Sequence, residues 1–513
     1  MVIEIKDYLK RHSFVYLVPF FFLSILNKIE FVQHPFFGLE YEDSYIYSDA
    51  ARSINYNYDW SYKPLQVNSC IDGSLTACNA TTTYSGHLIA LPFIISLINK
   101  IAGYSIYNIF IFNFIISFLV IFVVDQIIKL IYPQQHWRSF LPLLFLVTTP
   151  FINLFNTSGL AETFSSFSLL LFVLFFFKTV TRKFFIQSSS FWCSLFFLAA
   201  SILIKRENIV LIAITPLTAI FLFFRKELKQ YGIRNILVYF LLSAVIIVAI
   251  GFLIDFRDIE NQEGTAIASL TFAFSNTLMI FPVFLASYVN AEFWGLTGIA
   301  LIISVFFLFK APNLKLLITF SLFLLYVLLY STHYRSYYQV KFGEVNVFDT
   351  LRYSSNYFPL VCICLSSINL KISNSYVKYF SVLMVVGYLF FTFIYSYQLR
   401  VNFSDEENLT RIEPAKKVLA LINKNDIIIT DIPLIFHLFG NDNQIIVDAY
   451  STSAKRIQYY LSNKSISNVY ILNNIDNQMN KERYPDYFKL LKFFKSIRIK
   501  TISNRYELLK ISK

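Results

Sequence analysis

Three carboxylates close together in the sequence are the first candidates for acid–base chemistry. The stretch 41–52 reads YEDSYIYSDAAR and contains Glu42, Asp43 and Asp49, with Tyr45 between them. If a helix begins at Asp43, a carboxylate at its start accepts backbone N–H hydrogen bonds and is held in one orientation. Such a group can act as a general base on a hydroxyl or an amine. We predict Asp43 or Glu42 as the base and Tyr45 and Asp49 as substrate contacts; the alternative is an ordinary helix cap followed by a surface turn.

Basic residues at the edges of apolar runs are the candidates for binding an anion. Lys205 and Arg206 lie between two such runs, where charges are costly and usually line a cavity or pair with one another. Arg352 stands at the edge of another run, and a guanidinium can bind a phosphate bidentately. Lys63 is a further candidate for a phosphate contact. The alternatives are a surface turn neutralised by Glu207, an Arg352 that snorkels to the membrane interface, and a Lys63 without a role.

Two more polar residues are predicted to bind substrate. Glu162 begins an apolar run and can pair with one of the basic residues or contact a sugar; the alternative is a carboxylate that only faces the helix dipole. His87 precedes another apolar segment, and its alternative is a histidine packed at the interface.

Metal and nucleotide sites are not indicated. The six histidines are scattered without an HExxH motif, and Cys362 and Cys364 are two positions apart, so they do not share a helix face. No cofactor is predicted, although a divalent metal stays open. The chain has no glycine-rich loop for a nucleotide sugar. Cys70 and Cys78 are predicted to form a disulfide outside the membrane, with two free thiols as the alternative.

The composition indicates that an integral membrane bundle positions these residues. Of 513 residues, 56% are hydrophobic and only 15% are charged, whereas soluble domains carry about 25% charged residues. Apolar runs of about 17 to 25 residues, enough for a helix to cross the hydrocarbon, recur about eleven times. They lie near 13–31, 105–131, 139–155, 160–177, 184–204, 208–224, 233–254, 293–309, 314–331, 353–370 and 379–398.

The distribution of Lys and Arg predicts the topology. The net charge of +12 comes from short basic clusters between apolar runs, so it marks inside loops and does not indicate nucleic acid as a partner. The first run is predicted to be an uncleaved span with the N-terminus in the cytoplasm. An odd number of crossings then places the loop 33–103 and everything after about residue 400 outside. The segments 87–102 and 265–290 are predicted to be outside helices lying on or dipping into the membrane.

The predicted domains are a transmembrane catalytic bundle over 1–400, including the outside loop 33–103, and an outside α/β domain over 401–513. In the second domain, apolar patterning predicts helices at 414–423, 453–461 and 487–496, and strands at 427–430, 444–448 and 468–472. No internal repeat is visible, which disfavours transporters built from two homologous halves.

Five short motifs in this setting resemble the membrane-embedded lipid-linked sugar transferases of the C-type fold (GT-C). Within them the chain is similar to the protein O-mannosyltransferases, the aminoarabinose transferase of lipid A and the mycobacterial arabinofuranosyl and mannosyl transferases. Their first loop often reads acidic-Asp-Ala-Tyr-Ile, and this chain has EDSYI at 42–46. The other similar segments are HLIALP at 87–92, GLAE at 159–162, KREN at 205–208 and DTLRY at 349–353 followed by Pro359.

The resemblance implies a glycosyltransferase, hexosyl or pentosyl, that moves a sugar from a polyprenyl-phosphate carrier to a glycan, lipid or protein acceptor. It would work at the outer face of a bacterial cytoplasmic membrane, among membrane lipids. The basic residues at 205, 206 and 352 would stabilise the leaving phosphate, and a single displacement would invert the anomeric carbon. The commonest acidic motif of the aminoarabinose and protein O-mannosyl branches is Asp-Glu rather than Glu-Asp, which leaves the base open between Glu42 and Asp43. The alternatives are a lipid or glycan transporter or flippase, and a glycan polymerase or ligase.

Overall fold

The computed structural model of the chain describes residues 15–36, 47–48, 50–52, 54, 90–254, 281–282, 296–333, 347–368 and 375–512. The last range has gaps at 424, 433–434, 437–438, 440–444, 449–453, 465 and 476–493. The chain divides into two compact units, one formed by 1–35 with 110–400 and the other by 36–109 with 401–513. Each unit is described by itself.

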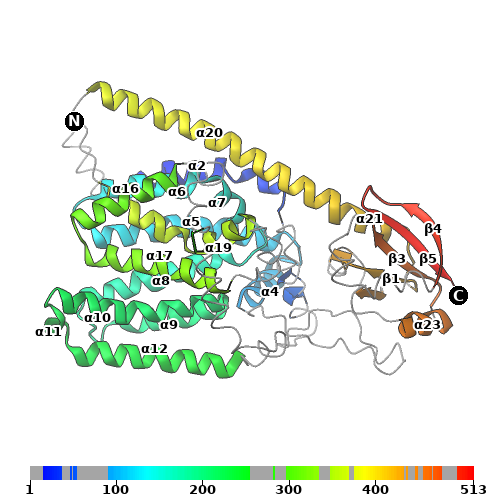
Figure 1. Cartoon of the computed structure of the whole chain (residues 1–513), viewed down its shortest axis with the longest axis horizontal. Coiled ribbons are helices and arrows are strands. Elements are labelled where there is room, and N and C mark those ends of the chain that lie inside the picture. Colours follow the sequence, from blue (N-terminus) through cyan, green and yellow to red (C-terminus); the bar gives the residue numbers. More distant parts are fainter. Residues whose placement is uncertain are drawn as a thin grey trace. The chain divides into compact units, whose positions relative to one another are not determined.

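The first unit is a bundle of helices (Figure 1). Its α-helices are α2 (Val18–Leu26), α5 (Asn108–Ile131), α6 (Phe140–Thr148), α7 (Pro150–Phe155), α8 (Glu162–Thr181), α9 (Ser189–Ile204), α10 (Ile214–Phe224), α11 (Leu228–Tyr231), α12 (Ile233–Ile254), α16 (Thr297–Lys310), α17 (Leu314–His333), α19 (Val347–Leu365) and α20 (Ser375–Glu407), whose last turns belong to the second unit. Short 3-10 helices occur at η1 (Val15–Leu17), η2 (Ile29–Val32), η4 (His136–Ser139) and η5 (Arg206–Ala213).

Helix α19 lies at the centre of this bundle, where it packs against α6, α8, α16 and α17. Helix α8 packs against α9 on its other side. Local sequence features separate consecutive helices at two places. Pro150 begins α7 after an extended Thr149, because a proline inside a helix removes a hydrogen bond and clashes with the preceding turn. Gly232, with φ of 70°, ends α11 before α12.

The protein is a multi-pass membrane protein. In the described part of the chain five helical segments are long and apolar enough to cross a membrane: Asn108–Ile131, Glu162–Thr181, Arg206–Phe224, Ile233–Gly251 and Leu314–Ser331. Each of the eleven predicted runs coincides with at least one helix, but several of these helices are shorter. The predicted number of crossings, about eleven, stays a prediction.

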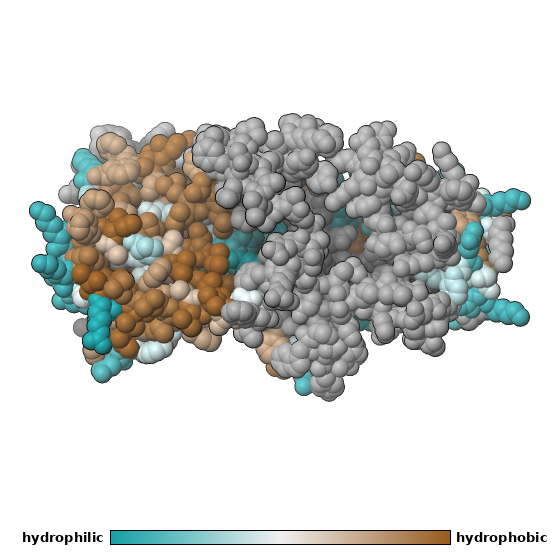
Figure 2. Space-filling model, turned by 60° about the horizontal axis from the view of Figure 1, so that its bottom comes forward, coloured by the Kyte–Doolittle hydropathy of each residue, from teal (hydrophilic) through white to brown (hydrophobic). Residues whose placement is uncertain are grey.

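The outer helices of the bundle expose apolar side chains, as lipid contact requires. Helix α12 exposes Ile233, Leu237, Leu241, Val245 and Val248, which are spaced three and four residues apart and so share one helix face. Figure 2 shows the corresponding face of the bundle as a broad hydrophobic band, with hydrophilic residues at the end where α11 lies.

The second unit contains α4 (Ala90–Ala102), the π-helical turn η6 (Asn408–Ile412), α21 (Glu413–Leu419), α23 (Ala454–Ser462) and a five-stranded sheet. The strands are β1 (Ile427–Thr430), β2 (Ile445–Asp448), β3 (Val469–Asn474), β4 (Lys495–Thr501) and β5 (Tyr506–Ser512), in the order β2-β1-β3-β5-β4. Strand β1 runs parallel to β2 and β3, whereas β5 is antiparallel to β3 and β4.

This architecture confirms the predicted C-terminal α/β fold, with one correction. Strands β1, β2 and β3 lie where the apolar pattern predicts them, and α4, α21 and α23 are helical as expected. The predicted helix 487–496 is wrong at its end, because Lys495 and Ser496 begin strand β4; the part before residue 494 lies outside the described residues. In β4, Ile497 and Ile499 alternate with Arg498 and Lys500, which is the period of a strand.

Candidate functional site

A buried carboxylate at the start of α8 is the centre of the candidate site. Glu162 is the first residue of α8 and only 1% exposed. The turn that leads into it is held by hydrogen bonds: the Asn113 amide on α5 donates to the carbonyl oxygens of Ser158 (2.7 Å) and Leu160 (2.8 Å). These bonds bind the turn 158–162 to α5, so Glu162 enters the bundle in a defined position.

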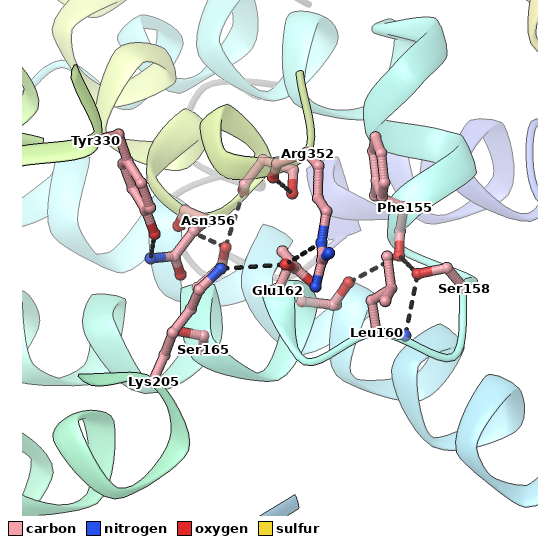
Figure 3. A network of polar contacts seen from close by, with 12 residues as sticks. Phe155, Ser158, Leu160, Glu162, Ser165, Lys205, Tyr330, Arg352 and Asn356 are labelled. Carbon is pink, nitrogen blue, oxygen red and sulfur yellow. Dashed lines mark hydrogen bonds and ion pairs between the residues drawn. The ribbon is translucent and has the colours of Figure 1, made fainter. Parts of the chain in front are cut away.

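Two cations from different parts of the chain converge on Glu162 (Figure 3). Lys205, at the junction of α9 and η5, donates from Nζ to Glu162 Oε1 over 3.1 Å. Arg352, on α19, donates from Nε to the same oxygen over 2.9 Å. The side chains of Lys205 and Arg352 are 10% and 7% exposed. The segments with Glu162, Lys205 and Arg352, far apart in the sequence, therefore form one cluster, which we call the Glu162 triad.

The three side chains of the Glu162 triad sum to a charge of +1, and the neighbouring Arg206 and Glu207 add one charge of each sign. Buried ion pairs gain less from attraction than they lose in hydration unless further polar groups compensate. Aromatic faces supply part of that compensation here. The Lys205 ammonium lies 5.7 Å from the ring centroid of Tyr330 and 5.5 Å from that of Tyr353, and the Arg352 guanidinium lies 5.9 Å from Tyr353.

A buried network next to the triad fixes the helices that carry it. Asn208, in η5 and fully buried, donates to Ser165 Oγ on α8 (2.8 Å) and accepts from the Tyr326 hydroxyl on α17 (2.7 Å) and the Asn356 amide on α19 (3.2 Å). The rings of Tyr326, Tyr330, Tyr353 and Tyr357 stack between α17 and α19. Because Asn208 is three residues from Lys205 and Asn356 is four from Arg352, this network sets the positions of both cations.

Of the residues predicted from the sequence, the structure brings together Glu162, Lys205 and Arg352. Arg206 follows Lys205 as the first residue of η5 and is half-buried. The predicted base and its neighbours, together with the other site residues of the first loop, lie outside the described residues: Glu42, Asp43, Tyr45, Asp49, Lys63, Cys70, Cys78 and His87. The residues described nearest to them, Tyr47–Ser48 and Ala50–Arg52, are helical, as the helix predicted from residue 43 requires.

Sequence reasoning missed two further buried cations. Lys28 is 1% exposed and donates to Ser24 Oγ (2.8 Å) and Ser117 Oγ (3.1 Å). Arg400 is 2% exposed and donates to the Asn153 carbonyl oxygen (2.8 Å). The two cations are close enough to act on each other electrostatically. They lie near the ends of the first and last predicted spans, and this position is the sequence signal that could have identified them.

Among the described residues no three His, Cys, Asp or Glu side chains come together as metal ligands. Cys193, Cys362 and Cys364 are free thiols within the bundle.

The chain is similar to solved structures, whereas the two sequence comparisons find no relative. A scan of protein-family models and a search of curated proteins both find no match. ArnT from Cupriavidus metallidurans matches in the apo state with a TM-score of 0.57 and 11% identity, and bound to undecaprenyl phosphate with a TM-score of 0.56 and 10% identity. Both matches cover 97% of this chain and 98% of that chain.

The archaeal oligosaccharyltransferase AglB from Archaeoglobus fulgidus, in complex with an inhibitory peptide and a dolichol-phosphate, matches with a TM-score of 0.54 and 11% identity. The match covers 95% of this chain and 73% of that chain. The chain therefore has the GT-C fold, and the predicted resemblance to this fold is confirmed.

Proposed function

We propose that the protein is an inverting glycosyltransferase that takes a sugar from a polyprenyl-phosphate carrier and transfers it to an acceptor. The observation that carries the proposal is the Glu162 triad, a buried cluster with excess positive charge in a GT-C fold. The neighbours with this fold include ArnT bound to undecaprenyl phosphate and AglB in complex with a dolichol-phosphate.

The charge of the triad suits a phosphate. An ammonium has three N–H donors, and in the described part of the chain Lys205 uses one of them on Glu162 and none on another acid. Lys205 and Arg352 together offer two positive charges, and Glu162 neutralises one of them. A lipid phosphate would accept hydrogen bonds from the Lys205 ammonium and would bring a negative charge to the two cations.

The same charges would act on the transition state. In the proposed reaction the bond between the anomeric carbon and a phosphate oxygen breaks, and the electron pair leaves with the lipid phosphate. That phosphate gains one negative charge, so Lys205 and Arg352 hold it more strongly as the bond breaks than before. Arg206 is proposed as a further contact of the phosphate, and Glu162 orients both of its partner cations.

The acceptor would be activated from the first loop. Asp43 or Glu42 takes the proton from an acceptor hydroxyl or amine while its oxygen or nitrogen attacks the anomeric carbon. One displacement without a covalent intermediate inverts that carbon. We place this chemistry at the outer face of a bacterial cytoplasmic membrane, with the 401–513 domain outside and the N-terminus inside.

Binding of undecaprenyl phosphate tests the proposal directly. The purified protein in mild detergent is titrated with undecaprenyl phosphate, and bound lipid is counted by native mass spectrometry; undecaprenol, which lacks the phosphate, is the ligand control. We expect Lys205→Met to weaken binding of the phosphate by roughly ten-fold to one hundred-fold, the worth of one charged hydrogen bond. Lys417→Met, which removes an exposed cation paired with Glu413, is the matched control and should bind like wild type. Equal retention of undecaprenol and undecaprenyl phosphate would refute a phosphate site.

A lipid or glycan transporter is the second candidate function. The buried Lys28 and Arg400 favour it, because ionisable residues inside a membrane bundle often mark a transport pathway. Proteoliposomes loaded with a glycosylated polyprenyl phosphate separate the two functions. A transferase releases polyprenyl phosphate and forms a glycosylated product, whereas a transporter moves the intact lipid to the other leaflet without releasing either.

A further inference from the structure

A basic groove lies at the far end of α8 from the Glu162 triad. It has a volume of about 1010 Å³ and is formed by the turn between α8 and α9 and by the segment from α11 into α12. Its cations are Arg182, Lys183 and Lys229. The rest of the lining is Phe185, Gln187, Ser188, Ser189, Gln230, Tyr231, Gly232 and Asn235, so no carboxylate lines the groove among the described residues.

The three cations form no ion pair with another described residue. Arg182, Lys183 and Lys229 are all exposed. The carboxylate nearest in sequence is Glu227, which acts electrostatically on Tyr231 and is not part of the lining. Like charges gathered in a concave surface raise the local concentration of anions.

The walls of the groove are fixed by the fold. Lys183 and Phe184 have φ of 53° and 55°, a left-handed conformation that non-glycine residues rarely adopt. The turn is held by a hydrogen bond from Phe184 N to the Thr179 carbonyl oxygen (2.9 Å). The buried Phe184 ring packs edge-on against Tyr239 of α12 at 5.6 Å between centroids. This contact joins the two walls, so the backbone segments that carry the three cations are linked by a buried contact.

The groove lies at a membrane boundary. Helix α8 has 20 residues and so spans about 30 Å, the thickness of the hydrocarbon core. The Glu162 triad is at one end of it and the groove at the other. Phe185 and Trp192 beside the groove are 52% and 53% exposed, and the exposed apolar face of α12 begins at Ile233. Aromatic side chains of this kind are enriched where membrane meets water.

We propose that this groove binds the phosphodiester headgroup of an anionic phospholipid from the leaflet opposite the Glu162 triad. The cations bind the phosphate oxygens, Gln187, Ser189 and Asn235 bind the remainder of the headgroup, and the acyl chains lie against the apolar face of α12. Basic pockets between helices on one side of a membrane are suited to such headgroups. The site does not depend on the function proposed for the triad.

The test compares two variants that each remove three positive charges. The groove variant is Arg182→Gln, Lys183→Asn and Lys229→Gln; the control variant is Lys226→Asn, Arg234→Gln and Lys310→Gln, all exposed and none in the lining. Asn is chosen at 183 and 226 because both have positive φ, which Asn tolerates. Each protein is placed in nanodiscs of phosphatidylglycerol and phosphatidylcholine, and the lipids retained after release are counted by native mass spectrometry.

We expect wild type and the control variant to retain phosphatidylglycerol in preference to phosphatidylcholine, and the groove variant to bind it roughly ten-fold more weakly or less. Equal retention by both variants would overturn the proposal and leave the cations as markers of topology only. Inorganic phosphate is added as a competitor, and displacement of the lipid at equal concentration would overturn the lipid as ligand in favour of free phosphate. If the triple variant does not fold, Arg182→Gln and Lys229→Gln are measured separately.

Discussion

Removal of the Glu162 carboxylate should destabilise the protein strongly and make it more responsive to phosphate. In Glu162→Gln the charge of the triad rises from +1 to +2, and the side chains of Lys205 and Arg352, 10% and 7% exposed, lose their shared acceptor. Breaking a buried pair from one side costs about 3 to 5 kcal/mol. Because Gln keeps one acceptor oxygen, we expect a loss of about 2 to 3 kcal/mol in the free energy of unfolding.

The assay is unfolding in detergent, with and without undecaprenyl phosphate. Since the phosphate would supply the missing negative charge, its stabilising effect should be larger in Glu162→Gln than in wild type at the same concentration. Glu413→Gln is the matched control: its pair with Lys417 is exposed by 39% and 50%, and solvent screening limits the expected change to less than about 0.5 kcal/mol. Two results would refute the reasoning: equal losses in Glu162→Gln and Glu413→Gln, or the same stabilisation by undecaprenyl phosphate in the variant as in wild type.

Two further predictions concern the support of the triad and the second unit. Asn208→Leu removes a fully buried amide that contacts α8, α17 and α19, so it should lower the free energy of unfolding by about 2 to 3 kcal/mol and weaken undecaprenyl phosphate binding. Asn313→Ser, at the start of α17, is the control. Unchanged binding in Asn208→Leu would argue against a positioning role. Burial raises the pKa of Asp431, after β1, above its ordinary value of 3.8, so the folded protein holds this proton more tightly than the unfolded chain. Stability should therefore fall as pH rises from 3.8 through the raised pKa, and Asp431→Asn should flatten that part of a melting-temperature profile against pH; an identical profile in variant and wild type would contradict it.

The sequence predicts that Glu162 can pair with one of the basic residues, but not that Lys205 and Arg352 both converge on it. Lys205 is indicated by a positive charge outside the membrane, where the topology disfavours one, and Arg352 is indicated by its position at the edge of an apolar run. Their common partner lies 43 residues before Lys205 and 190 before Arg352. That pairing depends on how α8, α9 and α19 pack, and hydropathy says only that each of them is apolar.

Two kinds of structure escaped prediction for different physical reasons. The strands β4 and β5 lie on the antiparallel side of a mixed sheet. The side chains of β4 are exposed along its whole length, so the alternation of Ile497 and Ile499 with basic residues does not mark a buried face. Lys28 and Arg400 lie near the ends of the first and last predicted spans, where a cation commonly lies at the membrane interface. Ser24 and Ser117 instead bind the Lys28 ammonium inside the bundle, and the α7 backbone binds Arg400.

The burial of the Glu162 triad is itself an argument for a role beyond stability. Replacing a buried ion pair or triad by apolar residues of similar volume is often neutral or stabilising by about 1 to 4 kcal/mol. Glu162 is 1% exposed and Arg352 is 6% exposed, so both charged groups lie inside the bundle. A carboxylate that holds two cations in a bundle of apolar helices, at some cost in hydration, keeps a positive charge in one place. A phosphate that gains charge as its bond to a sugar breaks is a ligand for which such a fixed charge is needed.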